Sequence, residues 1–173
     1  RSYYEETLVV RVHPEILARQ RLPADLVGKK IWSERFEDIA SFERYLSRNG
    51  VRIVKFFLNV SKAEQKRRFM QRLDQPSKNW KFSTGDLKER DRWDDYQSAY
   101  EATIRNTASR EAPWHVVPAD NKWYTRLVVA AVVVEAMSKL GLHFPKLSAA
   151  QKEDLQHARA LLAANGAKSK SKR

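Results

Sequence analysis

The chain of 173 residues contains no cysteine. This absence excludes disulfide frameworks, thiolate metal sites and cysteine nucleophiles together. Four histidines lie at positions 13, 115, 143 and 157, without a spacing that suggests a shared metal ion. No apolar run approaches the length needed to cross a bilayer, and no secretory signal is visible. We therefore expect a cytoplasmic protein that does not enter a membrane.

Glycine is also scarce, with only five in the chain. None of them forms the pattern GxxxxGK[ST], whose backbone amides cradle the phosphates of a nucleotide. The first residue is an arginine rather than a methionine. We therefore expect an incomplete fragment that lacks a phosphate-binding loop of its own.

Positive charge is abundant, with a formal net charge of +12. It is concentrated in two short places. Residues 61–92 carry ten Lys and Arg against five Asp and Glu, and residues 168–173 carry four basic residues and no acidic one. Because aromatic residues and a proline interleave with the charges of 61–92, we expect that segment to be ordered and to bind anionic ligands.

The apolar pattern predicts an α/β protein. β-branched and apolar runs predict strands at 7–12, 52–60 and 114–117. Apolar residues at helical spacing predict helices over 34–48, 91–109, 120–141 and 148–165. Ser61 with Glu64 matches a capping box, so a further helix begins directly after the second strand. Strands alternating with helices favour a parallel sheet.

In a parallel sheet, ligands bind beyond the carboxyl ends of the strands. Three segments are expected at that edge, namely the residues after His13, the junction 59–61 and the turn 118–120. His13 and His115 have no acidic partner that the sequence can assign. Asp120 is expected to cap the helix that follows it.

Arg67, Arg68 and Arg72 lie within two turns of the helix that follows Ser61. Three cations so close repel one another unless anions lie between them, and the guanidinium fork fits phosphate oxygens with two parallel hydrogen bonds. A solvated helix face with Glu64 and Asp74 as partners explains the same residues. The sequence leaves both readings open.

The segment 75–86 reads QPSKNWKFSTGD and carries Lys78, Trp80 and Lys81. It fits a mobile flap over a charged ligand, a nucleic-acid surface, or a loop packed by its aromatic residues. Arg90 and Asp94 lie where this flap meets the next helix. We expect Asp94 to pair with the arginines, and the neighbouring aromatic residues to belong to the core.

Three strings closely resemble the polyphosphate kinase 2 family. They are RSYYEETLVVRVHPE at 1–15, FFLNVSKAEQKRRFMQRLDQPSKNWKFSTGDLKERDRWDDY at 56–96, and APWHVVPADNKWYTRLVV at 112–129. The resemblance implies a P-loop kinase-like parallel sheet flanked by helices, with a helical lid at about 62–92. It assigns residues 1–147 to the C-terminal part of the family domain, without the Walker A loop. Residues 148–173 form a C-terminal helix and basic tail that match no motif.

The resemblance also implies a kinase that transfers phosphoryl groups between inorganic polyphosphate and a nucleoside mono- or diphosphate, making ADP or ATP. It implies Mg²⁺ as cofactor, bridging phosphates, and we expect a homo-oligomer. It assigns catalytic roles to Arg1, Arg67, Arg68 and Arg72, and phosphate binding to Lys66, Lys78, Lys81 and Arg90. Asp86 and Asp94 would support the lid, and no residue of this chain is expected to bind metal.

The same residues also suit a second class of function, namely nucleic-acid binding. The basic, aromatic segment and the basic tail would also suit a nucleic-acid-binding module without catalysis. Under the kinase reading, we expect the isolated chain to have little or no activity, because the phosphate loop is missing.

Overall fold

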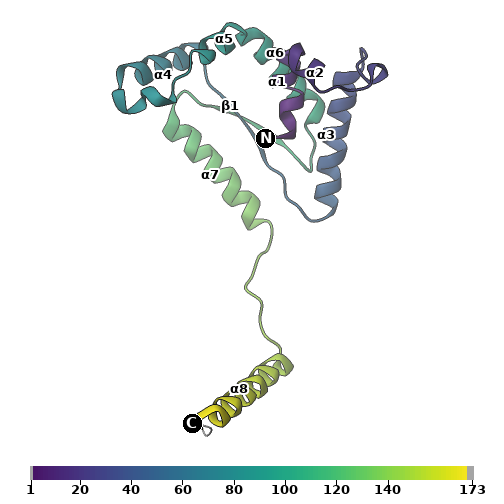
Figure 1. Ribbon diagram of the computed structural model, residues 1–173, viewed down its shortest axis with the longest axis vertical. Helices are drawn as coiled ribbons and strands as arrows, with labels where there is room; N and C mark the ends of the chain where they lie inside the picture. Colours follow the sequence, from purple (N-terminus) through teal and green to yellow (C-terminus); the bar gives the residue numbers. More distant parts are fainter. Residues whose placement is uncertain (1, 171–173) are drawn as a thin grey trace. The chain divides into compact units, whose positions relative to one another are not determined.

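The computed structural model describes residues 2–170, with side chains described over 2–163. The chain divides into two units, Arg1–Ala136 and Met137–Arg173. The helices, labelled in Figure 1, are Val9–Val12 (α1), Pro14–Arg19 (α2), Ile31–Arg48 (α3), Lys62–Asp74 (α4), Gly85–Asp91 (α5), Trp93–Thr107 (α6), Lys122–Ser138 (α7) and Ala149–Lys170 (α8). Short 3-10 helices lie at Tyr3–Glu6 (η1), Ala24–Leu26 (η2) and Pro76–Lys81 (η3).

The described residues form one sheet of two parallel strands, β1 (Lys55–Asn59) and β2 (Trp114–Pro118). Phe57 pairs with Val116, and Asn59 pairs with Pro118 at the carboxyl end. The predicted strands at 52–60 and 114–117 are therefore confirmed, and so is their parallel direction. Helices dominate the rest of the described chain, which is a mostly helical α/β structure.

The strand predicted at 7–12 is wrong. This segment forms a turn followed by the short helix α1. Val10 and Val12 are buried, and α1 packs against α6. The Thr7 hydroxyl lies 3.2 Å from the hydroxyl of Thr103 on α6, which holds the turn before α1 in place. Strand propensity reflects a fit to a pleated, half-buried surface, and packing against a helix overrides it here.

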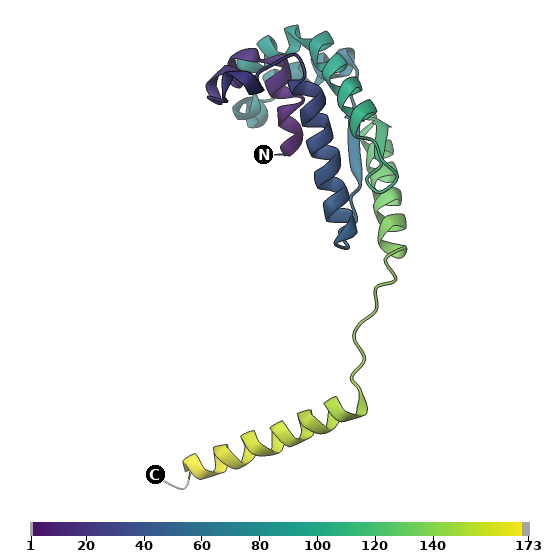
Figure 2. The same cartoon turned by 90° about the vertical axis from the view of Figure 1, so that its right-hand side faces the viewer.

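Helix α3 confirms the prediction over 34–48 and extends it to Ile31. Its apolar side chains recur at helical spacing and are buried at Ile31, Phe36 and Ile39. The helix ends where Gly50 takes a positive φ of 84°, and the Val51 N–H donates to Leu46 O at 3.1 Å. This Schellman pattern needs a residue without a Cβ at its left-handed position. Figure 2 shows α3 beside the strands.

A buried ion pair joins Lys55, the first residue of β1, to Glu43 on α3. Lys55 Nζ lies 2.5 Å from Glu43 Oε2, and it also donates to Tyr4 OH at 3.0 Å and Thr107 O at 2.9 Å. Tyr3 and Tyr4 donate to the other carboxylate oxygen of Glu43. The side chains of Lys55 and Glu43 are only 6% and 2% exposed. Burial lowers the pKa of Lys55, and the hydrogen bond to Glu43 opposes that shift.

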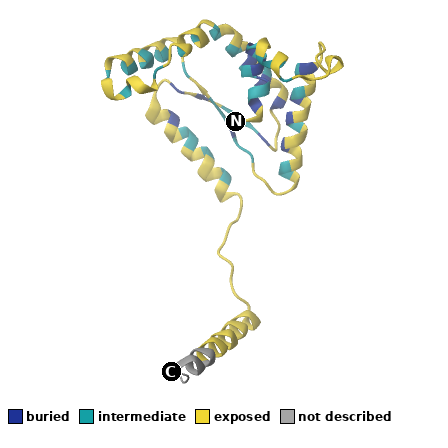
Figure 3. Ribbon diagram, viewed as in Figure 1, coloured by how far each residue is buried: buried dark blue, intermediate teal, exposed yellow. Residues whose placement is uncertain are grey.

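Much apolar surface remains exposed outside this centre. In the sheet, the side chains of Leu58 and Val116 are both exposed. In α7, Thr125 is buried, whereas the other residues are intermediate or exposed. Figure 3 shows the buried residues gathered where α1, α3, α6 and the strands meet. Within the part of the chain that the structure describes, no helix combines the length and the apolar character that crossing a membrane requires.

The buried ion pair generates a stability prediction. Glu43→Leu leaves the Lys55 ammonium buried without its counter-charge, so we expect it to lower the free energy of unfolding by about 3–5 kcal/mol. The double variant Glu43→Leu/Lys55→Met removes both charges and should regain most of that loss. Urea unfolding followed by circular dichroism measures both effects.

The matched control is Glu101→Leu, which breaks the exposed pair between Glu101 and Arg105 on α6. It should change the free energy of unfolding by less than about 1 kcal/mol. A Glu43→Leu variant no less stable than this control would contradict the assigned role.

Candidate functional site

A hydrogen bond joins the segments that follow the carboxyl ends of β1 and β2, at the start of α4. The Ser61 hydroxyl accepts the Glu64 N–H at 3.1 Å, which confirms half of the predicted capping box. The other half is replaced, because the Ser61 N–H donates to Asp120 Oδ1 at 2.7 Å. Asp120, expected as a cap of the helix after it, therefore contacts the start of α4. Two of the three expected edge segments, 59–61 and 118–120, meet here.

This replacement frees the Glu64 carboxylate for the arginines. Arg67 donates to both of its oxygens from Nε and Nη2, at 2.6 and 2.7 Å, and Arg68 Nε donates to Oε1 at 2.7 Å. These hydrogen bonds lower the pKa of Glu64 to about 2. Glu64 therefore stays ionised and holds two guanidinium groups close together.

The two arginines differ in what else they bind. Arg68 Nη2 donates to Ala119 O at 2.7 Å and to Asp120 O at 3.1 Å, and its side chain is only 22% exposed. Arg67 has a side chain 63% exposed. Arg68 therefore ties α4 to the turn after β2, whereas Arg67 presents its outer edge to solvent.

Arg72 lies one turn beyond Arg68. Its Nη1 is 3.9 Å from Asp86 Oδ2 on α5, and its guanidinium lies 5.5 Å from the centre of the Phe69 ring. The Asn79 side chain donates to Arg72 O and holds the end of α4. The pairing of Arg72 with Asp86 links α4 to α5 across η3.

The remaining predicted residues are spread over the same segment. Lys66 is exposed on α4, and Lys78 lies on η3. Lys81 Nζ lies 4.9 Å from the Trp80 ring, which is 78% exposed. Arg90 Nη1 donates to Lys62 O and to Gln65 Oε1, both at 2.8 Å.

Two predicted residues lie apart from this group. Asp94 is exposed in the first turn of α6, and its expected pairing with the arginines is absent from the ion pairs formed by residues with described side chains. Arg1 lies outside the described residues.

A cluster that the sequence did not reveal surrounds His13. His13 Nε2 lies 2.8 Å from Glu89 Oε2 on α5, and its Nδ1 lies 3.0 Å from Glu15 Oε1. Tyr96 OH donates to the same Glu89 oxygen at 2.7 Å, and Arg92 Nη1 donates to Val12 O. The sequence could not assign this partner to His13, because Glu89 lies 76 residues away along the chain.

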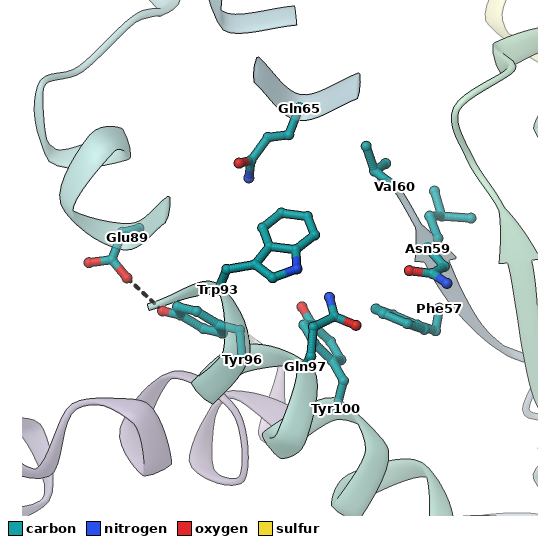
Figure 4. Close-up of a pocket in the computed structure, with 10 residues that line it drawn as sticks. Phe57, Asn59, Val60, Gln65, Glu89, Trp93, Tyr96, Gln97 and Tyr100 are labelled. Carbon is teal, nitrogen blue, oxygen red and sulfur yellow. Dashed lines mark hydrogen bonds between the residues drawn. The ribbon is translucent and has the colours of Figure 1, made fainter. Parts of the chain in front are cut away.

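A pocket of about 240 Å³ lies beyond the carboxyl end of β1, among α4, α5 and α6. Its lining combines aromatic side chains, primary amides, two apolar residues and a carboxylate: Phe57, Trp93, Tyr96 and Tyr100; Asn59, Gln65 and Gln97; Leu58 and Val60; and Glu89. Figure 4 shows these lining residues, most of them labelled, and the hydrogen bond between Tyr96 and Glu89. Trp93 and Tyr96, expected in the core, line this pocket.

The described residues offer no ligand set for a metal ion. Among the side chains described over residues 2–163, no group of three or more His, Asp or Glu is placed to hold one. Mg²⁺ in phosphoryl-transfer enzymes is usually held by one or two carboxylates together with phosphate oxygens and water.

Comparison with known families gives one match that covers most of the chain. The model of the family described as polyphosphate kinase 2 matches residues 1–143. This range contains β1, β2 and the whole basic segment from α4 to α5.

Two bacterial proteins named for their activity are similar to this chain. The ADP-polyphosphate phosphotransferase of Rhodopseudomonas palustris is 49% identical over 156 residues, covering 90% of this chain and 54% of that protein. The AMP/ADP-polyphosphate phosphotransferase of Meiothermus ruber is 44% identical over 146 residues, covering 84% of this chain and 51% of that protein.

A crystal structure of polyphosphate kinase 2 from Arthrobacter aurescens TC1 resembles this chain with a TM-score of 0.77 and 41% sequence identity. The match covers 91% of this chain and 53% of that one. The chain thus spans about half the length of these relatives.

The His13 cluster predicts a dependence of stability on pH. The hydrogen bond to Glu89 is the main cause that raises the pKa of His13 above its ordinary value of 6.5. Protonated His13 therefore stabilises the fold at pH values below 6.5, and this stabilisation is lost as the pH rises through the folded-state pKa. An NMR titration of the imidazole should give a pKa above 6.5, and Glu89→Gln should lower it.

The control is Glu101→Gln, which removes an exposed carboxylate on α6 that pairs with Arg105. It should leave the His13 titration unchanged. Equal His13 pKa values in the two variants would show that Glu89 does not hold the imidazole in solution.

Proposed function

The chain belongs to the polyphosphate kinase 2 family, and we propose that it contributes the basic lid of an enzyme that transfers phosphoryl groups between inorganic polyphosphate and a nucleotide. The observation that carries the proposal is the family match over residues 1–143, which contains the basic segment on α4, η3 and α5. The similar polyphosphate phosphotransferases of Rhodopseudomonas palustris and Meiothermus ruber support the same reaction class.

The reaction moves one phosphoryl group. The bond from the terminal phosphorus of polyphosphate to its bridging oxygen breaks, and a phosphate oxygen of the nucleotide forms the new bond. Polyphosphate leaves one unit shorter. Such transfers need little covalent help from the protein, and depend on positioning and on cations around the migrating group.

The arginines of α4 suit that task by their charge and spacing. We assign Arg67 to direct phosphate contact, since its guanidinium is exposed and held by Glu64. Arg68 is 22% exposed and is anchored to the turn after β2, so its proposed role combines contact with positioning. Arg72, paired with Asp86, would reach phosphate if the lid closes.

The lysines and Arg90 extend the positive surface. Lys66, Lys78 and Lys81 lie on α4 and η3 and would bind phosphates further along the polymer. A polyanion crossing these residues would neutralise charges that otherwise repel one another. Mg²⁺ would enter with the phosphates. In this proposal the complete family domain has a P-loop kinase fold, and the present chain forms part of that domain.

The nucleotide acceptor is proposed as a mono- or diphosphate. The similar proteins are named for different nucleotides, which include ADP, AMP with ADP, and GDP. A homo-oligomer in a cytoplasmic setting remains part of the proposal.

The proposal predicts that polyphosphate binds the chain through Arg67. Arg67→Ala removes an exposed guanidinium, and we expect about tenfold weaker binding of polyphosphate because charge-assisted hydrogen bonds are lost. Isothermal titration calorimetry with polyphosphate of defined length, at two salt concentrations, measures the change.

The matched control is Arg105→Ala. Arg105 is also exposed, and it also pairs with a glutamate on its own helix. It should bind polyphosphate as the parent chain does. An RNA oligomer of equal charge serves as competitor, and tighter binding of RNA than of polyphosphate would favour the nucleic-acid-binding alternative and contradict the proposal.

A chimera tests the reaction itself. The 173 residues lack GxxxxGK[ST], so we expect them alone to bind polyphosphate but to make little ATP from ADP. Joining them to the half of the Rhodopseudomonas palustris relative that they do not match should give an enzyme that makes ATP. In that chimera, Arg67→Ala should lower kcat/KM at least about tenfold while circular dichroism stays unchanged.

Rapid ATP formation by the 173 residues alone would refute the expected dependence on a phosphate loop. A folded chimera that binds polyphosphate without any transfer would count against the proposed reaction.

A further inference from the structure

The imidazole of His13 lies between two carboxylates that come from different helices. Its Nδ1 lies 3.0 Å from Glu15 Oε1 on α2, and its Nε2 lies 2.8 Å from Glu89 Oε2 on α5. A neutral imidazole has one N–H donor and one acceptor nitrogen, whereas the imidazolium donates from both nitrogens. Because each nitrogen faces a carboxylate oxygen, the protonated ring alone satisfies both contacts.

The groups around this ring leave His13 as the one among them that titrates near neutral pH. Hydrogen bonds from His13 and Tyr96 lower the pKa of Glu89, and the charge of Arg92 acts in the same direction. A backbone hydrogen bond and the contact with His13 lower the pKa of Glu15. Burial raises the pKa of Tyr96, whose ring centre lies 6.3 Å from that of His13. Both carboxylates are therefore ionised, and the phenol neutral, at pH values where an imidazole exchanges its proton.

Helix α5 is held to the body of the protein at Glu89. None of the residues described for α5, Gly85–Asp91, is buried. The Arg90 side chain binds the start of α4, so that contact remains within the basic segment from α4 to α5. Glu89 is bound by His13 at the start of α2, and also by Tyr96 on α6, as Figure 4 shows. The contact with His13 therefore joins α5 directly to the N-terminal helices.

Loss of one proton from the ring weakens this contact. In either tautomer of the neutral ring, one nitrogen presents a lone pair to a carboxylate oxygen. Glu89 then loses its cationic neighbour, and its hydrogen bond to His13 either loses the assistance of that charge or is lost. Tyr96 still donates to Glu89. The hold on α5 is therefore reduced, rather than abolished, as the pH rises.

We propose that His13 is a proton-dependent clamp, whose imidazolium joins α5 to α2 through Glu89 and Glu15 and whose deprotonation frees the end of the basic segment. The clamp is a property of the fold, whatever the basic segment binds. Where that segment is the lid of the proposed function, His13 is a positioning residue that makes lid opening easier as the proton concentration falls.

Hydrogen exchange measures the clamp directly. The exchange of the α5 backbone amides is followed in the 173-residue chain across the NMR titration of His13, and is expressed as a protection factor, which removes the intrinsic pH dependence of exchange. We expect the protection of Gly85–Asp91 to fall about threefold as the imidazole loses its proton, because an ion pair of this exposure contributes about that much to local stability. Protection that stays constant across the titration would overturn the proposal.

Two variants identify the groups that form the clamp. His13→Gln keeps a hydrogen-bond donor but cannot be protonated, and Glu89→Gln keeps an oxygen that can accept from Tyr96 but removes the charge. In both variants we expect α5 to have the low protection of the deprotonated parent at every pH, with near-UV circular dichroism unchanged. Glu101→Gln removes an exposed carboxylate of α6 and should keep the pH dependence of the parent. That same pH dependence in His13→Gln would overturn the proposal, since another group would then hold α5.

The exchange measurements contain no polyphosphate and no nucleotide, so they separate the clamp from the proposed function. A chain that shows the clamp but does not bind polyphosphate keeps this inference and loses the proposed function. A chain that binds polyphosphate through Arg67, with protection of α5 independent of pH, keeps the proposed function and loses the clamp.

Discussion

The ion pair between Lys55 and Glu43 is the constraint on which the rest of the described fold depends. It fixes the start of β1 against α3, and the same ammonium group reaches the N-terminal tyrosines and the end of α6. Two charges this deeply buried are tolerated only when hydrogen bonds satisfy the whole group. Since Lys55 donates three times and Glu43 accepts from Lys55, Tyr3 and Tyr4, the register of β1 relative to three other segments is set at one point.

At its carboxyl end, β1 leads into the contacts that position the basic helix α4. Asp120 binds the first amide before α4, and Arg68 binds the carbonyl oxygens beside it, so the basic helix leaves the sheet in a defined direction. Glu64 gathers two guanidinium groups without neutralising the exposed edge of Arg67. The arginines of α4 and the aromatic pocket then lie side by side because Gln65 and Arg68 occupy one face of α4.

Much of this could be predicted from local patterns. Helix α3 follows from apolar spacing and from the Asn49–Gly50 stop, and the step from β1 into α4 follows from an apolar run before Ser61. The segment 7–12 was mispredicted because its β-branched residues satisfy a strand pattern and a buried face of a helix equally well. Its conformation depends on α6, which lies about 90 residues further along the chain, beyond the reach of any local pattern.

The sequence by itself determined the composition of the site: three arginines on one capped helix after an apolar strand, and no GxxxxGK[ST] pattern in 173 residues. Tertiary structure decided which arginine is anchored and which is exposed, which carboxylate holds His13, and which aromatic residues line a pocket instead of a core. The physical reason is separation along the chain. Local propensity and capping act over a few residues, whereas these contacts join groups 51 and 76 residues apart, and only the packed fold brings them within hydrogen-bond distance.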